Sequence, residues 1–205
     1  MFKYPIIVFE GIEASGKSSS IKFLKKYLKS NKIKFINFRE PGGTYFSEKL
    51  RNLILNKKFK INKKTELLLY LAARSENYEN IIKKNRGKKI IIIDRFTDST
   101  IAYQHYGKNI KKNIITKLNE FVTDNLKPDL TFLKIVNNKN RKKRLKTRKF
   151  NNKLDKLEDK FYNDVQLGFL KLSKNKNKKY IILDTNKLSE IEINQLIKNK
   201  INKYI

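Results

Sequence analysis

The chain has 205 residues, 39% of them hydrophobic, and these values predict one domain, residues 1–205, around a single core. It has no cysteine and one histidine, which excludes disulfides, a thiolate nucleophile and zinc sites built from several histidines. The formal net charge is +30, but lysine is spread along the whole chain with little aromatic interleaving, so no nucleic-acid partner is expected.

Strands and helices alternate along the predicted chain. The apolar run at residues 6–9 is short and β-branched, which is typical of a buried parallel strand, and residues 17–28 follow it with helical spacing. A strand is predicted at 33–38, before a Pro-Gly-Gly turn, and helices at 44–55 and 65–84. No stretch is long and apolar enough for a membrane span, and we expect no membrane contact and a cytoplasmic location.

The second half of the chain continues this alternation. Four consecutive isoleucines at 90–93 give the strongest strand signal, and strands are also predicted at 130–136 and 180–183. Ser189 and Glu192 have capping-box spacing ahead of an apolar stripe, which predicts a closing helix. Because the gaps between strands allow helical crossovers, the chain is predicted to form a five-stranded parallel sheet flanked by helices.

A polar, basic stretch interrupts this pattern between residues 137 and 160. It has few apolar anchors, so it is interpreted either as a pair of surface helices or as a mobile lid over a phosphate site. The lid is placed at about residues 138–160.

Residues 11–18 match the phosphate-loop pattern GxxxxGK[ST] in full, between a predicted strand and a predicted helix. In such a loop the backbone N–H groups face phosphate oxygens, Lys17 neutralises the terminal phosphates and Ser18 can ligate Mg²⁺. ATPases, GTPases and small-molecule kinases all use this loop, so it does not select a reaction. The predicted ATP site consists of Gly11, Ile12, Glu13, Ala14, Ser15, Gly16, Lys17, Ser18 and Ser19.

Two charged residues follow the isoleucine strand. Asp94 falls at its carboxyl end, where a carboxylate can hold the shell of a magnesium ion, although an aspartate there can also simply cap a helix. The guanidinium of Arg95 could grip an acceptor phosphate bidentately and offset charge in a transition state.

Several longer motifs accompany these residues: the phosphate loop, Arg39-Glu40-Pro41-Gly42-Gly43-Thr44, Glu48-Lys49-Leu50-Arg51, Ala72-Ala73-Arg74, the block from Asp94 to Gln104, and Pro128-Asp129-Leu130-Thr131. Through them, and over nearly its whole length, the chain resembles the bacterial thymidylate kinases among the P-loop nucleoside monophosphate kinases. The resemblance implies a three-layer P-loop kinase fold with a small helical lid, ATP and dTMP as substrates, dTDP as product, Mg²⁺ as cofactor and a homodimer.

The resemblance also assigns residues. It implies that Arg51 and Arg95 hold the dTMP phosphate and that Arg74 and Gln104 hydrogen-bond the thymine edge. The implied dTMP site consists of Glu13, Arg39, Pro41, Arg51, Tyr70, Arg74, Arg95, Thr100, Tyr103 and Gln104. The implied metal ligands are Ser18 and Asp94, and the implied catalytic residues are Lys17, Arg95, Arg148 and Glu13.

Three positions depart from the family pattern or vary within it. Tyr70 stands where the family usually has phenylalanine, and its ring can still stack on a base. His105 stands where the family tends to have glycine and is interpreted as a surface residue. Ala14 occupies a loop position that is arginine in some members, which implies that the lid supplies the catalytic cation. Arg148 is the first candidate, and the alternatives are Arg144, Lys149 and Lys153.

Two other functions stay open at this point. A kinase for a different monophosphate, such as dUMP, would differ around Tyr70 and Thr100. A P-loop protein that binds nucleic acid and uses ATP as a switch would account for the charge, but it would have no need of Arg51, Arg74 and Gln104 together.

Overall fold

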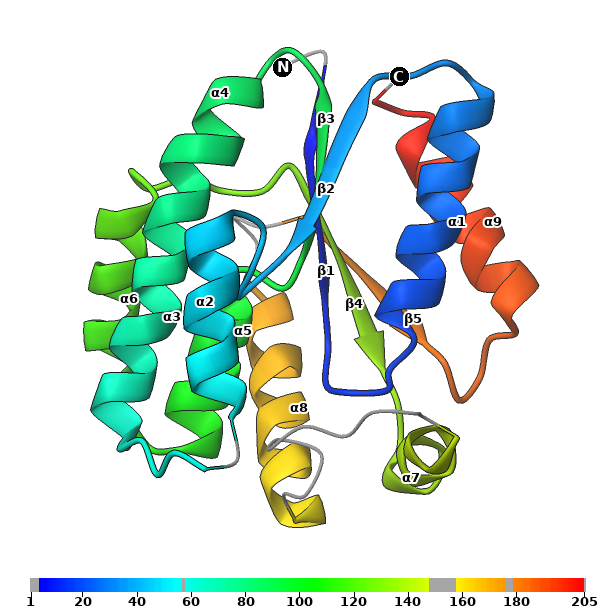
Figure 1. Ribbon diagram of the computed structural model, residues 1–205. Helices are drawn as coiled ribbons and strands as arrows, with labels where there is room; N and C mark the ends of the chain where they lie inside the picture. The colour runs from blue at the N-terminus through cyan, green and yellow to red at the C-terminus, as the bar shows by residue number, and fades with distance from the viewer. Residues whose placement is uncertain (1–3, 57, 148–157, 176–178, 205) are drawn as a thin grey trace.

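The computed structural model describes residues 4–56, 58–147, 158–175 and 179–204, built around a five-stranded sheet in the order β2-β3-β1-β4-β5 (Figure 1). The strands are β1 (Ile6–Glu10), β2 (Phe35–Arg39), β3 (Ile90–Asp94), β4 (Leu130–Ile135) and β5 (Tyr180–Asp184). Every neighbouring pair is parallel, so the carboxyl ends of all five strands lie on the same side of the molecule.

Helices cover both faces of the sheet. The α-helices are α1 (Lys17–Ser30), α2 (Tyr45–Leu55), α3 (Lys63–Asn77), α4 (Lys83–Asn85), α5 (Thr97–Ile101), α6 (Lys112–Val122), α7 (Asn138–Lys146), α8 (Asp159–Ser173) and α9 (Glu190–Ile201). Two π-helical segments, η1 (Tyr78–Ile82) and η2 (Ala102–Gly107), continue α3 and α5. In Figure 1, α1 and α9 lie on one side of the sheet, and α2, α3 and α6 lie on the other.

The isoleucine run of β3 contributes to the core on both faces, because successive side chains of a strand point in opposite directions. Ile90 and Ile92 pack in the cluster formed with α1 and α9, whereas Ile91 and Ile93 pack in the cluster that includes η1. All four are fully buried. This two-sided burial explains an uninterrupted apolar run in place of an alternating one.

The predicted α/β fold with five parallel strands is confirmed, as is the capping box of Ser189 and Glu192 at the start of α9. The helix predicted at 65–84 begins at Lys63 and passes through η1 into α4. No sequence signal was assigned to α6 or α8, although α8 buries Tyr162, Val165, Phe169 and Leu172 at helical spacing. No helix among the described residues is both long and apolar enough to cross a membrane.

The predicted lid is described only at its two ends, because residues 148–157 lie outside the described part of the chain. Its first part is α7, and α8 begins at its far end. The Nη2 atom of Arg141 lies 2.8 Å from Asp159 Oδ1, and the Nζ of Lys142 lies 2.6 Å from Asp159 Oδ2. These ion pairs hold the two ends of the segment together.

Candidate active site

The phosphate loop follows β1 and leads into α1. Gly11 and Gly16 have φ angles of 135° and 87°, which residues with a side chain adopt only with strain. A Cβ atom at Gly11 would also lie 2.2 Å from the carbonyl oxygen of Lys134 on β4. The two glycines of the motif are therefore required by the path of the backbone.

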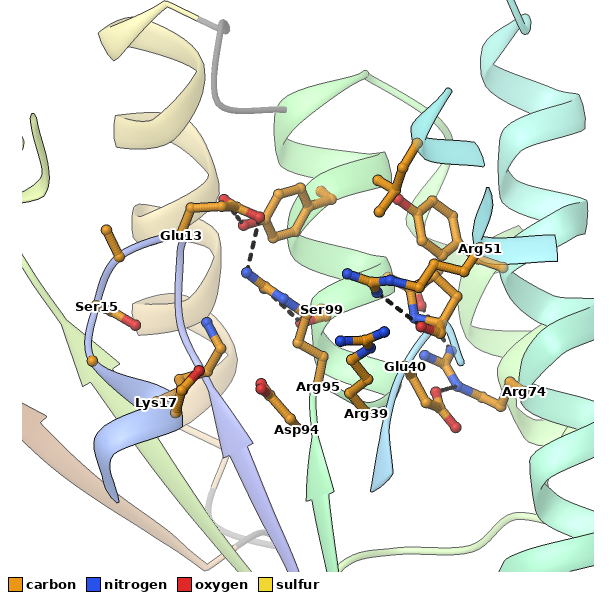
Figure 2. A pocket seen from close by; sticks show the side chains of 18 of the residues that line it. Glu13, Ser15, Lys17, Arg39, Glu40, Arg51, Arg74, Asp94, Arg95 and Ser99 are labelled. Atoms are coloured by element: carbon orange, nitrogen blue, oxygen red, sulfur yellow. Dashed lines mark hydrogen bonds and ion pairs between the residues drawn. The ribbon is translucent and has the colours of Figure 1, made fainter. Parts of the chain in front are cut away.

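Lys17 is held beneath this loop. Its ammonium group donates hydrogen bonds to the carbonyl oxygens of Gly11, at 2.8 Å, and Ile12, at 3.0 Å. Burial, followed by the nearby charge of Arg95, lowers the pKa of Lys17 to about 8. Asp94 lies beside it at the end of β3 (Figure 2), and the Oδ1 atom of Asp94 is buried without a hydrogen-bond partner.

Arg95 connects the phosphate loop to the other side of the cleft. Its Nη1 donates to the carbonyl of Gly11 at 2.9 Å, and its Nη2 pairs with Glu13 Oε1 at 2.9 Å. The guanidinium also lies over the ring of Tyr103, 5.1 Å from its centroid. Burial opposes the charge, but Tyr103, Glu13 and Asp94 outweigh burial and raise the pKa of Arg95. The cation is therefore fixed in place at the centre of the site.

Glu13 is the counterion that positions Arg95. Its second oxygen accepts a hydrogen bond of 2.5 Å from the hydroxyl of Tyr103. Burial alone would raise the pKa of this carboxyl, but Arg95 and Lys17, together with Tyr103, hold the pKa below its usual value. A buried carboxylate thus stays ionised between two cations.

Three arginines from separate elements converge opposite the loop (Figure 2): Arg39 at the end of β2, Arg51 on α2 and Arg95. Arg51 donates to the carbonyl of Pro41 at 2.8 Å, and Arg39 pairs with Glu48 at 3.2 Å. Burial, followed by Arg39, lowers the pKa of Arg51. Neighbouring cations repel one another, so this arrangement favours a bound anion.

Polar side chains behind the arginines are fixed by buried partners. Arg74 donates to Glu40 at 2.7 Å and to the hydroxyl of Thr100 at 2.7 Å. The amide nitrogen of Gln104 donates to Glu66 at 3.0 Å, and the Oε1 atom of Gln104 is buried without a partner. Because a carboxylate only accepts hydrogen bonds, this contact fixes which end of the Gln104 amide carries the oxygen.

These groups line one cleft with a volume of about 540 Å³. Most of the predicted site residues line it: Glu13, Ala14, Ser15, Gly16, Lys17, Ser18, Ser19, Arg39, Pro41, Arg51, Tyr70, Arg74, Asp94, Arg95, Thr100, Tyr103 and Gln104. Gly11 and Ile12 are not part of the lining and contribute their carbonyls to Lys17. Arg148, Lys149 and Lys153 lie outside the described residues.

Of the candidate lid cations, Arg144 on α7 is described and lines the cleft. Its Nη1 donates to the carbonyl of Ala14 and to the hydroxyl of Thr185, both at 3.1 Å. His105 is half-buried, in contrast to the surface position predicted for it, and its Nδ1 lies 2.9 Å from the carbonyl of Ile110. This contact ties the His105 side chain to the backbone of the segment that follows η2.

Glu10, which was not predicted, orders the segment that carries Arg95. It is fully buried at the end of β1 and accepts hydrogen bonds from the backbone of Phe96, at 2.9 Å, and Ser99, at 3.1 Å. Burial, followed by Asp98, raises the pKa of Glu10 to about 7. The available signal was a charged residue at the end of a buried strand, directly before the first glycine of the loop.

A parallel sheet with a phosphate loop after β1 and a cluster of arginines facing that loop defines a P-loop kinase. A model of the thymidylate kinase family matches residues 9–197. The chain belongs to the thymidylate kinase family.

Similar proteins cover nearly the whole chain. The thymidylate kinase of Thermosipho africanus is 41% identical over 189 residues, which are 90% of this chain and 92% of that protein. The thymidylate kinase of Mycoplasma capricolum is 38% identical over 196 residues, or 94% and 92% of the two chains. The crystal structure of thymidylate kinase from Ehrlichia chaffeensis superimposes with a TM-score of 0.77 at 34% identity, covering 97% of this chain and 98% of the other.

Proposed function

We propose that this protein transfers the γ-phosphate of ATP to dTMP and gives dTDP. The observation that carries this proposal is that the phosphate loop and the cluster of Arg39, Arg51 and Arg95 line the same cleft. Two anion sites in one cleft suit a donor and an acceptor phosphate that react directly with each other. Membership of the thymidylate kinase family supports the same reaction.

The donor side binds the triphosphate through the loop N–H groups and Lys17. The hydroxyl of Ser18 and the carboxylate of Asp94 fit a magnesium ion, because the Oδ1 atom of Asp94 is a buried acceptor without a partner. Mg²⁺ is commonly held by only one or two protein ligands together with phosphates and water. When bound there, it would neutralise charge on the phosphates.

On the acceptor side, Arg51 and Arg95 hold the phosphate of dTMP, and Arg39 adds positive charge. Glu13 and Tyr103 keep Arg95 in place before the nucleotide enters. No strong base is needed, because a phosphate monoester with a second pKa near 6 is already largely dianionic at neutral pH. Charge that moves onto the leaving ADP and the transferred phosphoryl group is offset by Lys17 and Arg95.

A cation from the predicted lid, residues 138–160 of the proposed single domain, completes the donor site. Arg148 stays the first candidate from the family resemblance, and Arg144 is supported by its place in the cleft. Such a cation acts by neutralising the γ-phosphate as it is transferred. A closed lid would also keep water from the reacting phosphates.

The base of dTMP fits the polar end of the cleft. Gln104 Oε1 is an acceptor without a partner, and thymine has an N–H at its N3 position. Arg74 offers hydrogen-bond donors at the same end, and the ring of Tyr70 can stack on the base. Cytosine has no hydrogen at N3 and would leave the Gln104 oxygen unpaired.

This difference predicts strong discrimination between bases. The kcat/KM for dTMP should exceed that for dCMP by at least ~10³, because a buried acceptor left unpaired is costly. ADP release in a coupled assay with ATP and each monophosphate measures the ratio. Comparable values for dCMP and dTMP would contradict the assignment of Gln104.

The same assay addresses the two alternative functions. Uracil also carries the N3 hydrogen, so Gln104 does not separate dUMP from dTMP, and any preference must arise around Tyr70 and Thr100. A nucleic-acid-dependent switch is disfavoured because the three arginines face the phosphate loop across a cleft. That alternative would gain support if duplex or single-stranded DNA, and not dTMP, stimulated ADP release.

We also propose that the protein forms a homodimer through α2, α3 and α6, which lie side by side in Figure 1. Large apolar side chains are exposed on all three helices, among them Tyr45 at 80%, Leu68 at 57% and Phe121 at 80%. Apolar residues gathered on neighbouring helices are typical of a surface that a partner covers.

Leu68→Glu is therefore expected to convert the dimer into a monomer, because a second copy would bury the new charge. Light scattering coupled to size-exclusion chromatography measures the mass. Ile191→Glu is the matched control, because Ile191 is 81% exposed on α9, across the sheet from the proposed interface. A wild-type protein that is monomeric, or a Leu68→Glu variant that stays dimeric, would contradict this interface.

A further inference from the structure

Lys134 is a buried lysine behind the phosphate loop. It lies on β4, where only 3% of its surface is exposed. Its ammonium group donates to the carbonyl oxygen of Gly16 at 3.1 Å and to the hydroxyl of Ser20 at 2.6 Å. The backbone of the same residue touches Gly11, where an added Cβ would meet the Lys134 carbonyl oxygen. One residue of β4 therefore supports both ends of the loop.

The contact with Gly16 affects the direction of the next peptide N–H. In a trans peptide the C=O and N–H bonds point in opposite directions. The Gly16 carbonyl accepts a helical hydrogen bond from the N–H of Ser20 at 3.3 Å, and Lys134 adds a second donor to the same oxygen. Lys134 therefore helps to hold this carbonyl, and with it the opposed N–H of Lys17, in a fixed orientation. The first N–H groups of a helix have no partner within the helix and are free to bind an anion.

The charge of Lys134 is only partly offset within the protein, where the carboxylate of Glu190 acts against the effects of burial and of Arg144. The hydrogen-bond partners of Lys134 are a carbonyl and a hydroxyl, and neither offsets a full positive charge. Burial, followed by Arg144, lowers the pKa of Lys134 to about 8. A cation at the N-terminus of α1 is also opposed by the partial positive charge of the helix end. A bound triphosphate would relieve both costs.

We propose that Lys134 is a positioning residue for ATP, which orients the phosphate loop through Gly16 and adds positive charge behind the bound phosphates. This role rests on the proposed use of the loop for ATP. It differs from that of Lys17, because Lys134 acts through the backbone of the loop and does not line the cleft.

Lys134→Met tests the role, because methionine has a similar length and no charge. The Kd for ADP, measured by calorimetry with Mg²⁺, should rise about tenfold, while the KM for dTMP should change less than about twofold. The melting temperature without nucleotide should equal or exceed that of the wild type, because a buried charge has been removed. A merely structural role would instead lower the melting temperature and disturb both substrates.

Two further variants control this experiment. Lys22→Met removes the same charge from the exposed surface of α1 and should leave the Kd for ADP unchanged. In Lys134→Met the hydroxyl of Ser20 loses the ammonium group that donates to it. The double variant Lys134→Met/Ser20→Ala removes this hydroxyl as well, so it should stay folded and show the same loss of affinity for ADP.

Unchanged ADP affinity in a folded Lys134→Met protein would overturn the role of Lys134, as would an equal loss in Lys22→Met. Failure of the proposed function is a separate result, because it would appear as a wild-type protein that forms no dTDP. ADP binding would still report on Lys134 in that case.

Discussion

Lys17→Ala is expected to lower kcat by at least ~10³ while the protein stays folded. The ammonium group is buried beneath the phosphate loop, and in the proposed mechanism it neutralises the phosphates as charge moves toward ADP. Alanine keeps the helix and removes a desolvated charge, so stability should change little. A coupled assay of ADP release measures kcat, and thermal unfolding checks the fold.

The matched control is Lys26→Ala, which removes an exposed lysine from the same helix. It should keep wild-type activity and a wild-type melting temperature. Substantial turnover by a folded Lys17→Ala variant would exclude the proposed role of the phosphate loop in the transfer.

Arg95→Ala should lower kcat/KM for dTMP by at least ~10³, because in the proposed mechanism the arginine both holds the acceptor phosphate and offsets charge in the transition state. The Kd for ADP should stay within about threefold of the wild-type value, because the loop N–H groups and Lys17 remain. Steady-state kinetics with varied dTMP and calorimetry with ADP separate these two effects.

Arg95→Lys provides the conservative comparison. Lysine keeps the charge but lacks the planar guanidinium, which donates to the Gly11 carbonyl and to Glu13 at the same time. Its kcat/KM is expected to lie between those of the wild type and Arg95→Ala. A loss of less than tenfold in Arg95→Ala, or an equal loss of ADP affinity, would show that Arg95 does not belong to the acceptor site.

The fold was predictable where one signal dominated. Four isoleucines at 90–93 identified β3, which lies next to the central strand β1 and is buried on both faces. The full phosphate-loop pattern predicted the strand before the loop and the helix after it. The sequence predicts no helix at α8, because the basic stretch before it resembles a lid, although the apolar residues of α8 have helical spacing. The π-helical segment η1 carries no distinct sequence signal, because its residues fit an ordinary helix equally well.

The sequence predicted the side chains that line the cleft. It did not predict the buried side chains that hold the backbone around the cleft in place. Motifs identified Arg51, Arg74 and Gln104, which the fold brings to the same cleft as Lys17. Buried supporting charges depend on tertiary contacts between distant segments. Lys134 is one example, because nothing in the sequence relates β4 to the carbonyl of Gly16.

Transfer of labelled γ-phosphate from ATP is the most direct test of the proposed reaction, because it distinguishes transfer from hydrolysis. The wild-type protein, given labelled ATP with dTMP, dUMP, dCMP or dAMP, should place the label in dTDP with dTMP among the best acceptors. Label found only as inorganic phosphate, or in the other nucleoside diphosphates in preference to dTDP, would contradict the proposed activity.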